Sequence, residues 1–285
     1  MPPKKKIATH KVQHIKGLLS QNHISTLCEI IKCPNIGECF TKPTLTIILL
    51  GDKCSRNCLF CSLKKGTPDN HYFGEPRRIA ETLKKIGIVH TVLNSACRDD
   101  LADSGAYHFA SCMHEIKSLG LPTSIEVLIP DLKGNTKALK TIISMNPDII
   151  NHNIKTIPRL YPSIRSKADY HRSLKLLRAI KRINPDIISK SGLMVGLGET
   201  KEEVTETIQQ LREAKCDILN IDHYIQTGRN RIAVKEFVTP EVFIEYKEFA
   251  QKLGFMHVES APFARSCYHS GDPDCLQTHK RNIRP

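Results

Sequence analysis

Three cysteines, Cys54, Cys58 and Cys61, lie within eight residues in the segment "CSRNCLFC". We call them the downstream trio. A structural zinc site takes four protein ligands, and no fourth cysteine or histidine follows here at comparable spacing. Three thiolates can instead hold three corners of a cubane iron–sulfur cluster and leave one iron open. The spacing therefore favours an iron–sulfur cluster, and the alternative is a zinc loop completed by a distant histidine.

A second group, Cys28, Cys33 and Cys39, lies just upstream in "CEIIKCPNIGEC"; we call it the upstream trio. Its spacing is too irregular for a zinc knuckle. It could carry a second cluster, again short of one protein ligand, or it could be three buried or reactive thiols without a cluster. The N-terminal lysines are not followed by an apolar segment, so we expect a cytoplasmic protein whose 11 cysteines are not structural disulfides.

Composition sets the class of protein. The 285 residues are 40% apolar, which is enough for one large domain with a sizeable core. No apolar stretch approaches the ~20 residues needed to span a membrane, so we expect no membrane partner. The net charge of +13 would suit nucleic acid, an acidic protein, an anionic cofactor or solubility alone, and it selects none of them.

Six β-rich runs alternate with polar, helix-compatible segments, and they must position the cysteines. The runs are residues 44–51, 87–96, 123–131, 147–154, 188–198 and 216–226, and a final run, residues 254–262, precedes the C-terminal tail. Six β/α units in series predict a parallel sheet with helices outside, as a doubly wound sheet or as an open or closed barrel. Thr200 followed by Glu203 predicts a helix start with a capping box. In either architecture chemistry occurs at the carboxyl ends of the strands, and the downstream trio directly follows the first run.

Several motifs together resemble the lipoyl synthase family of radical S-adenosylmethionine (SAM) enzymes. They are both trios, "NHN" at 151–153, "KSGLMVGLGET" at 190–200 and "RSCY" at 265–268, and the match extends from about residue 21 to about residue 270. The resemblance implies a parallel (β/α)6 partial TIM barrel. Residues 1–43 would form an N-terminal extension with the upstream trio, residues 44–254 the barrel, and residues 255–285 a C-terminal extension.

The resemblance also implies cofactors and chemistry. The downstream trio would hold a 4Fe–4S cluster whose open iron binds SAM, and the upstream trio with residue 267 an auxiliary 4Fe–4S cluster. The enzyme would insert two sulfur atoms, taken from the auxiliary cluster, at C6 and C8 of an octanoyl chain on a lysine of a lipoyl carrier domain. It would need a low-potential electron donor, and we expect no nucleic-acid partner.

By the same resemblance individual residues take roles. The metal ligands would be Cys28, Cys33, Cys39, Cys54, Cys58, Cys61 and Cys267. The residues that take part in catalysis would be Cys54, Cys58, Cys61, Arg265 and Cys267. The residues that contact SAM would be Phe60, Glu126, Asn153, Gly196 and Glu199.

Most of the polar candidates also have a structural interpretation. Glu126 and Asn153 could be hydrogen-bonded groups inside a barrel mouth, and residues 196–199 could form a strand-to-helix turn. Asp99 and Asp100 could cap the following helix or contact a cofactor.

Other single residues have less specific expectations. Arg165 and Arg265 could bind the clusters or the carrier, or they could be surface charges. We expect Cys97, Cys112 and Cys216 to pack in the interior. Cys275 is an unassigned thiol.

The sequence departs from the family at Cys267, where the resemblance predicts a serine. A thiolate is a softer ligand for iron than an alkoxide, so we expect a more stable auxiliary cluster. Three hypotheses follow: a lipoyl synthase, a radical SAM paralogue with another substrate whose auxiliary cluster is not sacrificed, and a basic zinc protein that binds nucleic acid. The sixth run, "DHYIQTGRN", also differs from the usual "GQYLQP" and could alter substrate binding.

Overall fold

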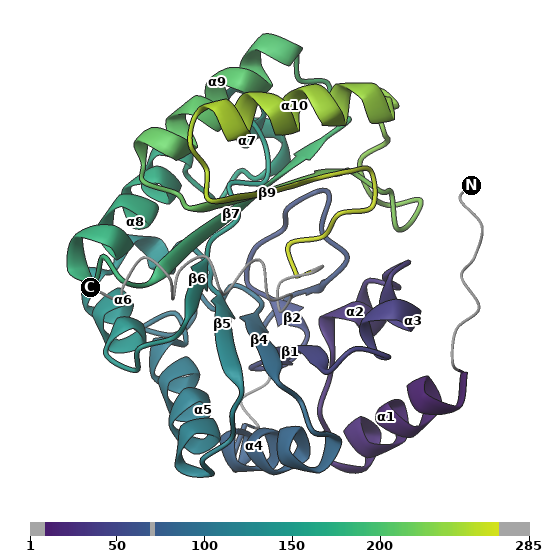
Figure 1. The fold of residues 1–285 in the computed structure, drawn as a ribbon, viewed down its shortest axis with the longest axis vertical. Helices are drawn as coiled ribbons and strands as arrows, with labels where there is room; N and C mark the ends of the chain where they lie inside the picture. Colours follow the sequence, from purple (N-terminus) through teal and green to yellow (C-terminus); the bar gives the residue numbers. More distant parts are fainter. Residues whose placement is uncertain (1–8, 69–71, 268–285) are drawn as a thin grey trace.

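The computed structural model describes residues 9–68 and 72–267, so Tyr268 and Cys275 lie outside the described part of the chain. A sheet of seven strands, all parallel, curves around the centre of the molecule (Figure 1). Its order is β1 (Thr44–Leu49), β4 (His90–Ser95), β5 (Ser124–Leu128), β6 (Ile149–Asn151), β7 (Ile188–Val195), β8 (Ile218–His223) and β9 (His257–Ser260). The strand order follows the chain order, as in a partial TIM barrel.

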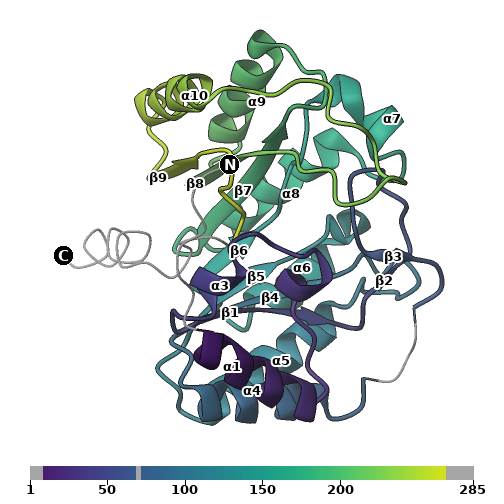
Figure 2. The ribbon, with the colours of Figure 1, turned by 90° about the vertical axis from the view of Figure 1, so that its right-hand side faces the viewer.

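The six β-rich runs each contain one strand of this sheet, so the predicted parallel β/α architecture is confirmed. The seventh strand, β9, pairs with β8 and lies in the final run, residues 254–262, which follows the six predicted units. It lies within residues 255–285, so part of the expected C-terminal extension lengthens the barrel sheet. A separate two-stranded sheet, β2 (Lys53–Cys54) with β3 (Lys64–Lys65), brackets the downstream trio (Figure 2).

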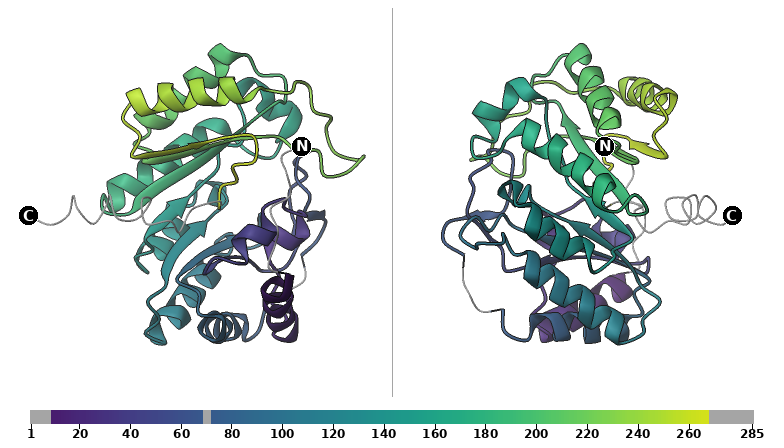
Figure 3. Two further views of the ribbon diagram at one scale, coloured as in Figure 1. Left: turned by 45° about the vertical axis from the view of Figure 1, so that its right-hand side comes forward. Right: turned by 90° about the vertical axis from the view of Figure 1, so that its left-hand side faces the viewer.

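Helices cover the outer, convex face of the sheet (Figures 1 and 3). They are α4 (Glu75–Ile86), α5 (Ala106–Ser118), α6 (Thr136–Ile143), α8 (Tyr170–Ile183), α9 (Lys201–Glu213) and α10 (Pro240–Lys252). Two short 3-10 helices, η1 (Leu132–Gly134) and η2 (Pro158–Leu160), and the short α7 (Tyr161–Ile164) lie in the connections. None of the described helices is long and apolar enough to cross a membrane.

Local sequence explains where these helices begin and end. Helix α9 starts at the predicted capping box: the Thr200 side chain accepts from the Glu203 backbone N–H, and the Glu203 carboxylate accepts from that of Thr200. Helix α4 has Pro76 in its first turn, where a missing N–H costs nothing, and ends at Gly87 in the left-handed conformation, φ 76°.

Three helices precede the sheet: the first lies beside α4, and the two short ones lie at the open side of the barrel. They are α1 (Thr9–Gln21), α2 (Leu27–Ile30) and α3 (Ile36–Cys39), drawn in purple in Figure 1. The chain after β9, drawn in yellow, turns back from the sheet edge toward α2 and α3 (Figures 1 and 3). The Asn35 side-chain amide donates to the Phe263 carbonyl at 2.8 Å, which fastens this returning segment to the start of α3.

The inside of the barrel is apolar at one end and polar at the other. Ile149, Ile188 and Ile218 form a small cluster near the amino ends of three neighbouring strands. Because side chains alternate between the two faces of a strand, positions two residues further along point to the same interior. Those positions hold Asn151, Lys190 and Asn220. The core against the helices is mainly apolar, so the polar layer inside is a feature of the site.

Candidate active site

Glu126 lies in this polar layer rather than at the strand end. The Asn151 amide donates to one Glu126 carboxylate oxygen at 2.7 Å, and the Lys190 ammonium donates to the other at 3.2 Å. All three residues are fully buried. Lys190 was not singled out from the sequence, although its spacing of two residues from Gly192 on one strand placed it on the inner face. That Glu126 contacts SAM stays a prediction.

Residues 265–267 enter the barrel interior from its open side. The Arg265 guanidinium donates to the Asp222 carboxylate at 2.7 Å, and the Asn220 amide donates to the Arg265 carbonyl at 3.4 Å. A Cβ atom on Gly192 would lie 2.5 Å from Asn153 Oδ1 and 3.0 Å from Ser266 Oγ. Gly192 therefore leaves room for these two side chains, because a Cβ atom there would force the Asn153 side chain aside and crowd the Ser266 hydroxyl.

The upstream trio and Cys267 come together, although more than 200 residues separate them in the sequence. The Cys28 thiol contacts the thiols of Cys267 and Cys33, and these contacts raise its pKa. The pKa of Cys267 is lowered to about 6, first because Cys28 donates to its thiolate and then because the Thr46 hydroxyl does so. Burial first, and then the negative charges of Cys267 and Cys33, raise the pKa of Cys39 to about 12.

Local structure presents the upstream thiols on one side of a compact loop. Thr26 caps α2 by accepting from the Glu29 backbone N–H at 3.3 Å. The Cys33 N–H then donates to the Cys28 carbonyl at 2.9 Å, which closes the turn between the first two cysteines. Cys39 is the last residue of α3. Four thiols are the donor set that 4Fe–4S clusters use, so these residues fit such a group.

The downstream trio occupies the loop that follows β1. The Arg56 N–H donates to Cys54 Sγ at 3.4 Å, and the Cys61 N–H donates to the Cys58 carbonyl at 3.2 Å. Cys97, expected only to pack, lies against Cys54, and its thiol lowers the pKa of Cys54 to about 6 by donating to the thiolate. Burial raises the pKa of Cys61. Cys54 is thus buried beside the thiol of Cys97, whereas Cys58 and Cys61 are partly exposed.

Neither trio has the geometry of a site for one metal ion. Among residues 9–68 and 72–267, no three Cys, His, Asp or Glu side chains gather closely enough to hold a single ion. A cubane cluster is larger, because each thiolate binds a different iron. Both donor sets therefore fit a cluster by their chemistry: three thiols in the downstream trio, and four in the upstream trio with Cys267.

A buried ion-pair network holds the downstream loop against the strands. The Arg56 guanidinium donates to Asp99 at 2.7 Å and to Asp131 at 2.6 Å. The Arg98 guanidinium donates to Asp100 at 2.6 Å. Asp99 and Asp100 thus do not cap α5. The Asp103 carboxylate does so, by accepting from the backbone N–H groups of residues 105 and 107.

Replacing Asp131 by asparagine is expected to lower the free energy of unfolding by about 3 to 5 kcal/mol. Burial alone would raise the pKa of Asp131, but the Arg56 guanidinium outweighs burial and brings this pKa to about 2. Asp131 also accepts from Arg172 at 3.1 Å, so asparagine leaves the buried Arg56 with only one of its two carboxylates, that of Asp99, and removes the carboxylate that faces Arg172. Anaerobic urea unfolding would measure the change.

Glu81→Gln is a matched control for Asp131→Asn. It breaks the ion pair with Arg77, in which both side chains are about half exposed, so it should cost less than about 1 kcal/mol. Similar losses in the two variants would contradict a structural role for the buried network.

A cavity of about 220 Å³ lies between the downstream trio and the barrel interior. Phe60 and Asn153, two of the predicted SAM contacts, line it, and so do Cys61, Arg165 and Arg265. Within the described residues, Asn153 Oδ1 and the Nε atoms of Arg165 and Arg265 are buried without a hydrogen-bond partner. These atoms are available to a polar ligand in the cavity.

His152 is a further polar residue of this cavity. Its ring is buried, and burial lowers its pKa to about 4, so the ring is neutral near pH 7. Nδ1 lies 2.9 Å from the Ile129 carbonyl, to which it must donate. Nε2 is therefore an acceptor, and it has no partner within the described part of the chain. Sequence analysis placed His152 in the "NHN" segment but gave it no role.

Lys155, which sequence analysis missed, also lines the cavity. Its backbone has φ of 74°, which residues other than glycine seldom adopt. Hydrogen bonds hold this conformation: the Lys155 N–H donates to the Gly192 carbonyl at 2.8 Å, and the Met194 N–H donates to the Lys155 carbonyl at 2.9 Å. Burial lowers the pKa of its ammonium group. No spacing in the sequence signals such a conformation.

Gly196 and Glu199, the two other predicted SAM contacts, form a turn beside the cavity. The Glu199 carboxylate accepts from the N–H groups of Gly196 and Leu197. A Cβ atom on Gly196 would lie 2.8 Å from the Glu236 carbonyl oxygen and 2.8 Å from the His223 ring. The close approach at Gly196 is thus to the segment before α10, and contact with SAM stays a prediction.

Comparison with known proteins decides which family this arrangement represents. Residues 48–211 match the model of the Radical SAM superfamily. The lipoyl synthase of Caldanaerobacter subterraneus subsp. tengcongensis is 46% identical over 267 residues, which are 94% of each protein. The chain belongs to the lipoyl synthase family. The lipoyl synthase of Caldicellulosiruptor saccharolyticus is 48% identical over 92% of each protein, and that of Burkholderia mallei is 41% identical over 97% of this chain.

Members of the lipoyl synthase family are radical SAM enzymes, and this chain is therefore an enzyme that uses a 4Fe–4S cluster and SAM. The hypothesis of a zinc protein without enzymatic activity is wrong. Solved structures agree on the fold: methylornithine synthase aligns with a TM-score of 0.56 at 12% identity over 96% of this chain and 93% of its own. SuiB of Streptococcus suis bound to SAM aligns with a TM-score of 0.59 at 14% identity over 84% of this chain and 56% of its own.

Proposed function

We propose that this lipoyl synthase family member inserts two sulfur atoms, at C6 and C8 of an octanoyl chain carried on a lysine of a lipoyl carrier domain. The observation that carries the proposal is the assembly of two separate thiol sets in one barrel. One set alone would suffice for radical formation. A second set of four thiols gives the enzyme a place for a second cluster, and inserted sulfur needs a source.

The two thiol sets take different roles in this proposal. The downstream trio would hold the cluster that binds SAM, and the upstream trio with Cys267 would hold the auxiliary cluster. When bound, these groups supply a radical able to attack an unactivated C–H bond and the sulfur that replaces the hydrogen, which acid–base side chains cannot do. A low-potential electron donor would reduce the first cluster.

The protein's own residues would bind and orient the reactants. His152 Nε2 and Asn153 Oδ1 would accept hydrogen bonds from SAM, and the Arg165 guanidinium would attract its carboxylate. Leu27 and Ile31 also line the cavity; they would pack against the octanoyl chain and exclude water from it. Arg265, paired with Asp222, would hold the segment that carries Cys267.

The test uses the anaerobically reconstituted protein with reductant, SAM and an octanoyl-lysyl carrier domain, analysed by mass spectrometry. Gain of two sulfur atoms would support the proposal. If 5′-deoxyadenosine forms but the carrier is unchanged, the radical chemistry is supported and the proposed substrate is contradicted. A parallel reaction without SAM is the control, because sulfur transfer from iron and sulfide in solution would occur there too.

A further inference from the structure

A second hollow, of about 300 Å³, adjoins the active-site cavity. The two share three lining residues, Ile31, Ser62 and Thr227. The hydroxyl groups of Ser62 and Thr227 are 2.5 Å apart and hydrogen-bonded, and both side chains are at the protein surface. The hollow therefore lies directly outside the cavity, and we call it the mouth.

The mouth carries positive charge from two sides. Lys32 follows α2, and Arg229 and Arg231 lie in the loop that follows β8. No Asp or Glu lines the mouth, and within the described residues none of these three cations forms an ion pair with a carboxylate. Lys32 and Arg229 are exposed. In Figure 1, α2 and the loop after β8 both lie on the open side of the barrel.

Hydrogen bonds fix the loop that carries the two arginines. The Gln226 amide donates to the Gly228 carbonyl at 3.3 Å and to the Arg231 carbonyl at 3.1 Å. The Ile232 N–H donates to the Leu59 carbonyl at 3.3 Å, which ties this loop to that of the downstream trio. The backbone that carries the two arginines is thus held beside the cavity, as a docking surface requires.

We propose that the mouth, through Lys32, Arg229 and Arg231, docks an acidic surface of the carrier protein around its octanoyl-lysine. This inference rests on the proposed function. A cavity of about 220 Å³ can admit an acyl chain but not a folded domain. The body of the carrier must stay outside, against the residues at the opening. Since those residues are cationic and unpaired, a complementary partner is acidic.

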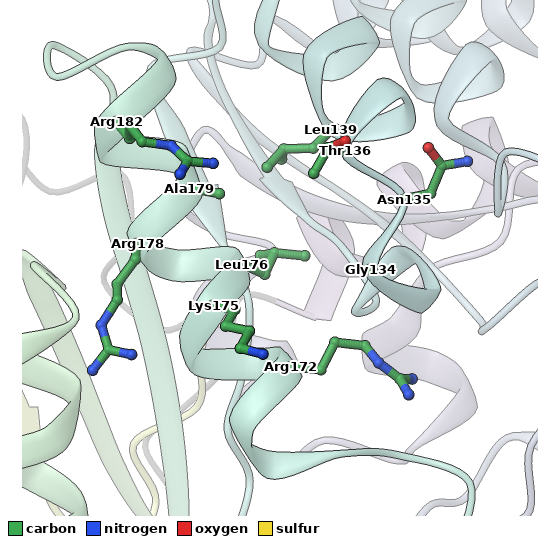
Figure 4. Close-up of a pocket in the computed structure, with 10 residues that line it drawn as sticks. All are labelled: Gly134, Asn135, Thr136, Leu139, Arg172, Lys175, Leu176, Arg178, Ala179 and Arg182. Carbon is green, nitrogen blue, oxygen red and sulfur yellow. The ribbon is translucent and has the colours of Figure 1, made fainter.

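A second basic hollow shows that charge alone does not identify the docking site. It measures about 370 Å³ and lies between α8 and the start of α6 (Figure 4). Arg172, Lys175, Arg178 and Arg182 line it, above apolar side chains. It shares no lining residue with the active-site cavity. Continuity with the cavity therefore favours the mouth, and the α8 hollow supplies a control in which the same change of charge can be made.

The experiment compares two double variants. The mouth variant carries both Arg229→Glu and Arg231→Glu, and the control variant carries both Arg178→Glu and Arg182→Glu. Both are reconstituted with clusters and assayed on an octanoylated carrier domain and on a short, neutral octanoyl-lysyl peptide. For the mouth variant, the ratio of kcat/KM on the carrier to that on the peptide should fall about tenfold or more, mainly through KM. For the control variant this ratio should stay at the value of the parent.

Salt provides a second measurement. Raising the ionic strength should raise the KM of the parent for the carrier, because salt screens the charges of the mouth. It should raise the KM of the mouth variant much less, because that variant lacks two of these charges. An unchanged ratio in the mouth variant, or an equal fall in the control variant, would overturn the docking site. If the parent converts neither carrier nor peptide, the proposed function fails instead, so the two failures are distinguishable.

Discussion

Alanine at all three positions of the downstream trio is expected to abolish the formation of 5′-deoxyadenosine from SAM. Alanine at all three positions of the upstream trio should leave SAM cleavage measurable but abolish sulfur insertion. The reason is that the thiols form two separate sets, one in the loop after β1 and one closed by Cys267. Removing one set removes the ligands of one cluster and spares those of the other. Each variant should therefore bind about half the iron and sulfide of the parent after anaerobic reconstitution.

Cys112→Ala is a matched control for both trio variants. Cys112 is a buried thiol in α5, packed in the main core, and belongs to neither set. Its substitution should cost some stability but leave the iron content and both reactions intact. Parent levels of iron in either trio variant would contradict the two-cluster arrangement. Loss of SAM cleavage with the upstream trio alone, at normal occupancy of the other cluster, would show that the two sets do not act separately.

The sequence predicted the parallel β/α architecture well because its signals are local. Each buried parallel strand is a short apolar run, and each outer helix is a polar segment with its own start and stop signals, such as the capping box at Thr200. The seventh strand, β9, is only four residues long and half-buried, so its pattern is weak. It forms because β8 offers an edge with free hydrogen-bonding groups.

Spacing alone predicted the candidate site only where its residues lie close in sequence, and the place of Cys267 beside the upstream trio was expected from the family resemblance. Both trios were recognised from spacing. The pairing of Glu126 with Lys190 joins two strands 64 residues apart and depends on which strand faces point inward. The contact of Cys97 with Cys54 depends on how the loops after two adjacent strands meet. Such long-range contacts follow from the register of the sheet, which the sequence alone does not specify.

The aspartates after β4 illustrate how local reasoning can choose the wrong partner. Asp99 and Asp100 precede a helix, and helix capping was a reasonable expectation for them. Both instead pair with arginines, and the capping role passes to Asp103. A buried guanidinium requires an anion more strongly than a helix end does, since an unpaired buried charge costs several kcal/mol and a missing cap about 1 kcal/mol.

Cys267→Ser is expected to make the auxiliary cluster less stable than it is in the parent. Cys267 lies in contact with Cys28, and the negative charges of Cys267 and Cys33 act on Cys39, so position 267 completes the upstream set. A serine oxygen is a harder and less acidic ligand than a thiolate. Without SAM, iron should pass from the reconstituted variant to a chelator about tenfold faster than from the parent. The effect should concern one cluster only, so half of the iron should leave at the parental rate.

The same variant separates the two remaining hypotheses about turnover. If the thiolate at position 267 protects the cluster from being consumed, the parent should keep its auxiliary cluster through several rounds of SAM cleavage, and Cys267→Ser should lose it with each sulfur inserted. Ser266→Ala is the matched control: Ser266 neighbours Cys267 and packs on Gly192, but it belongs to no thiol set. Equal iron release and equal cluster loss in parent, Cys267→Ser and Ser266→Ala would contradict any stabilisation by Cys267. Cysteine and serine would then be equally adequate ligands at position 267, and sulfur insertion would be intact.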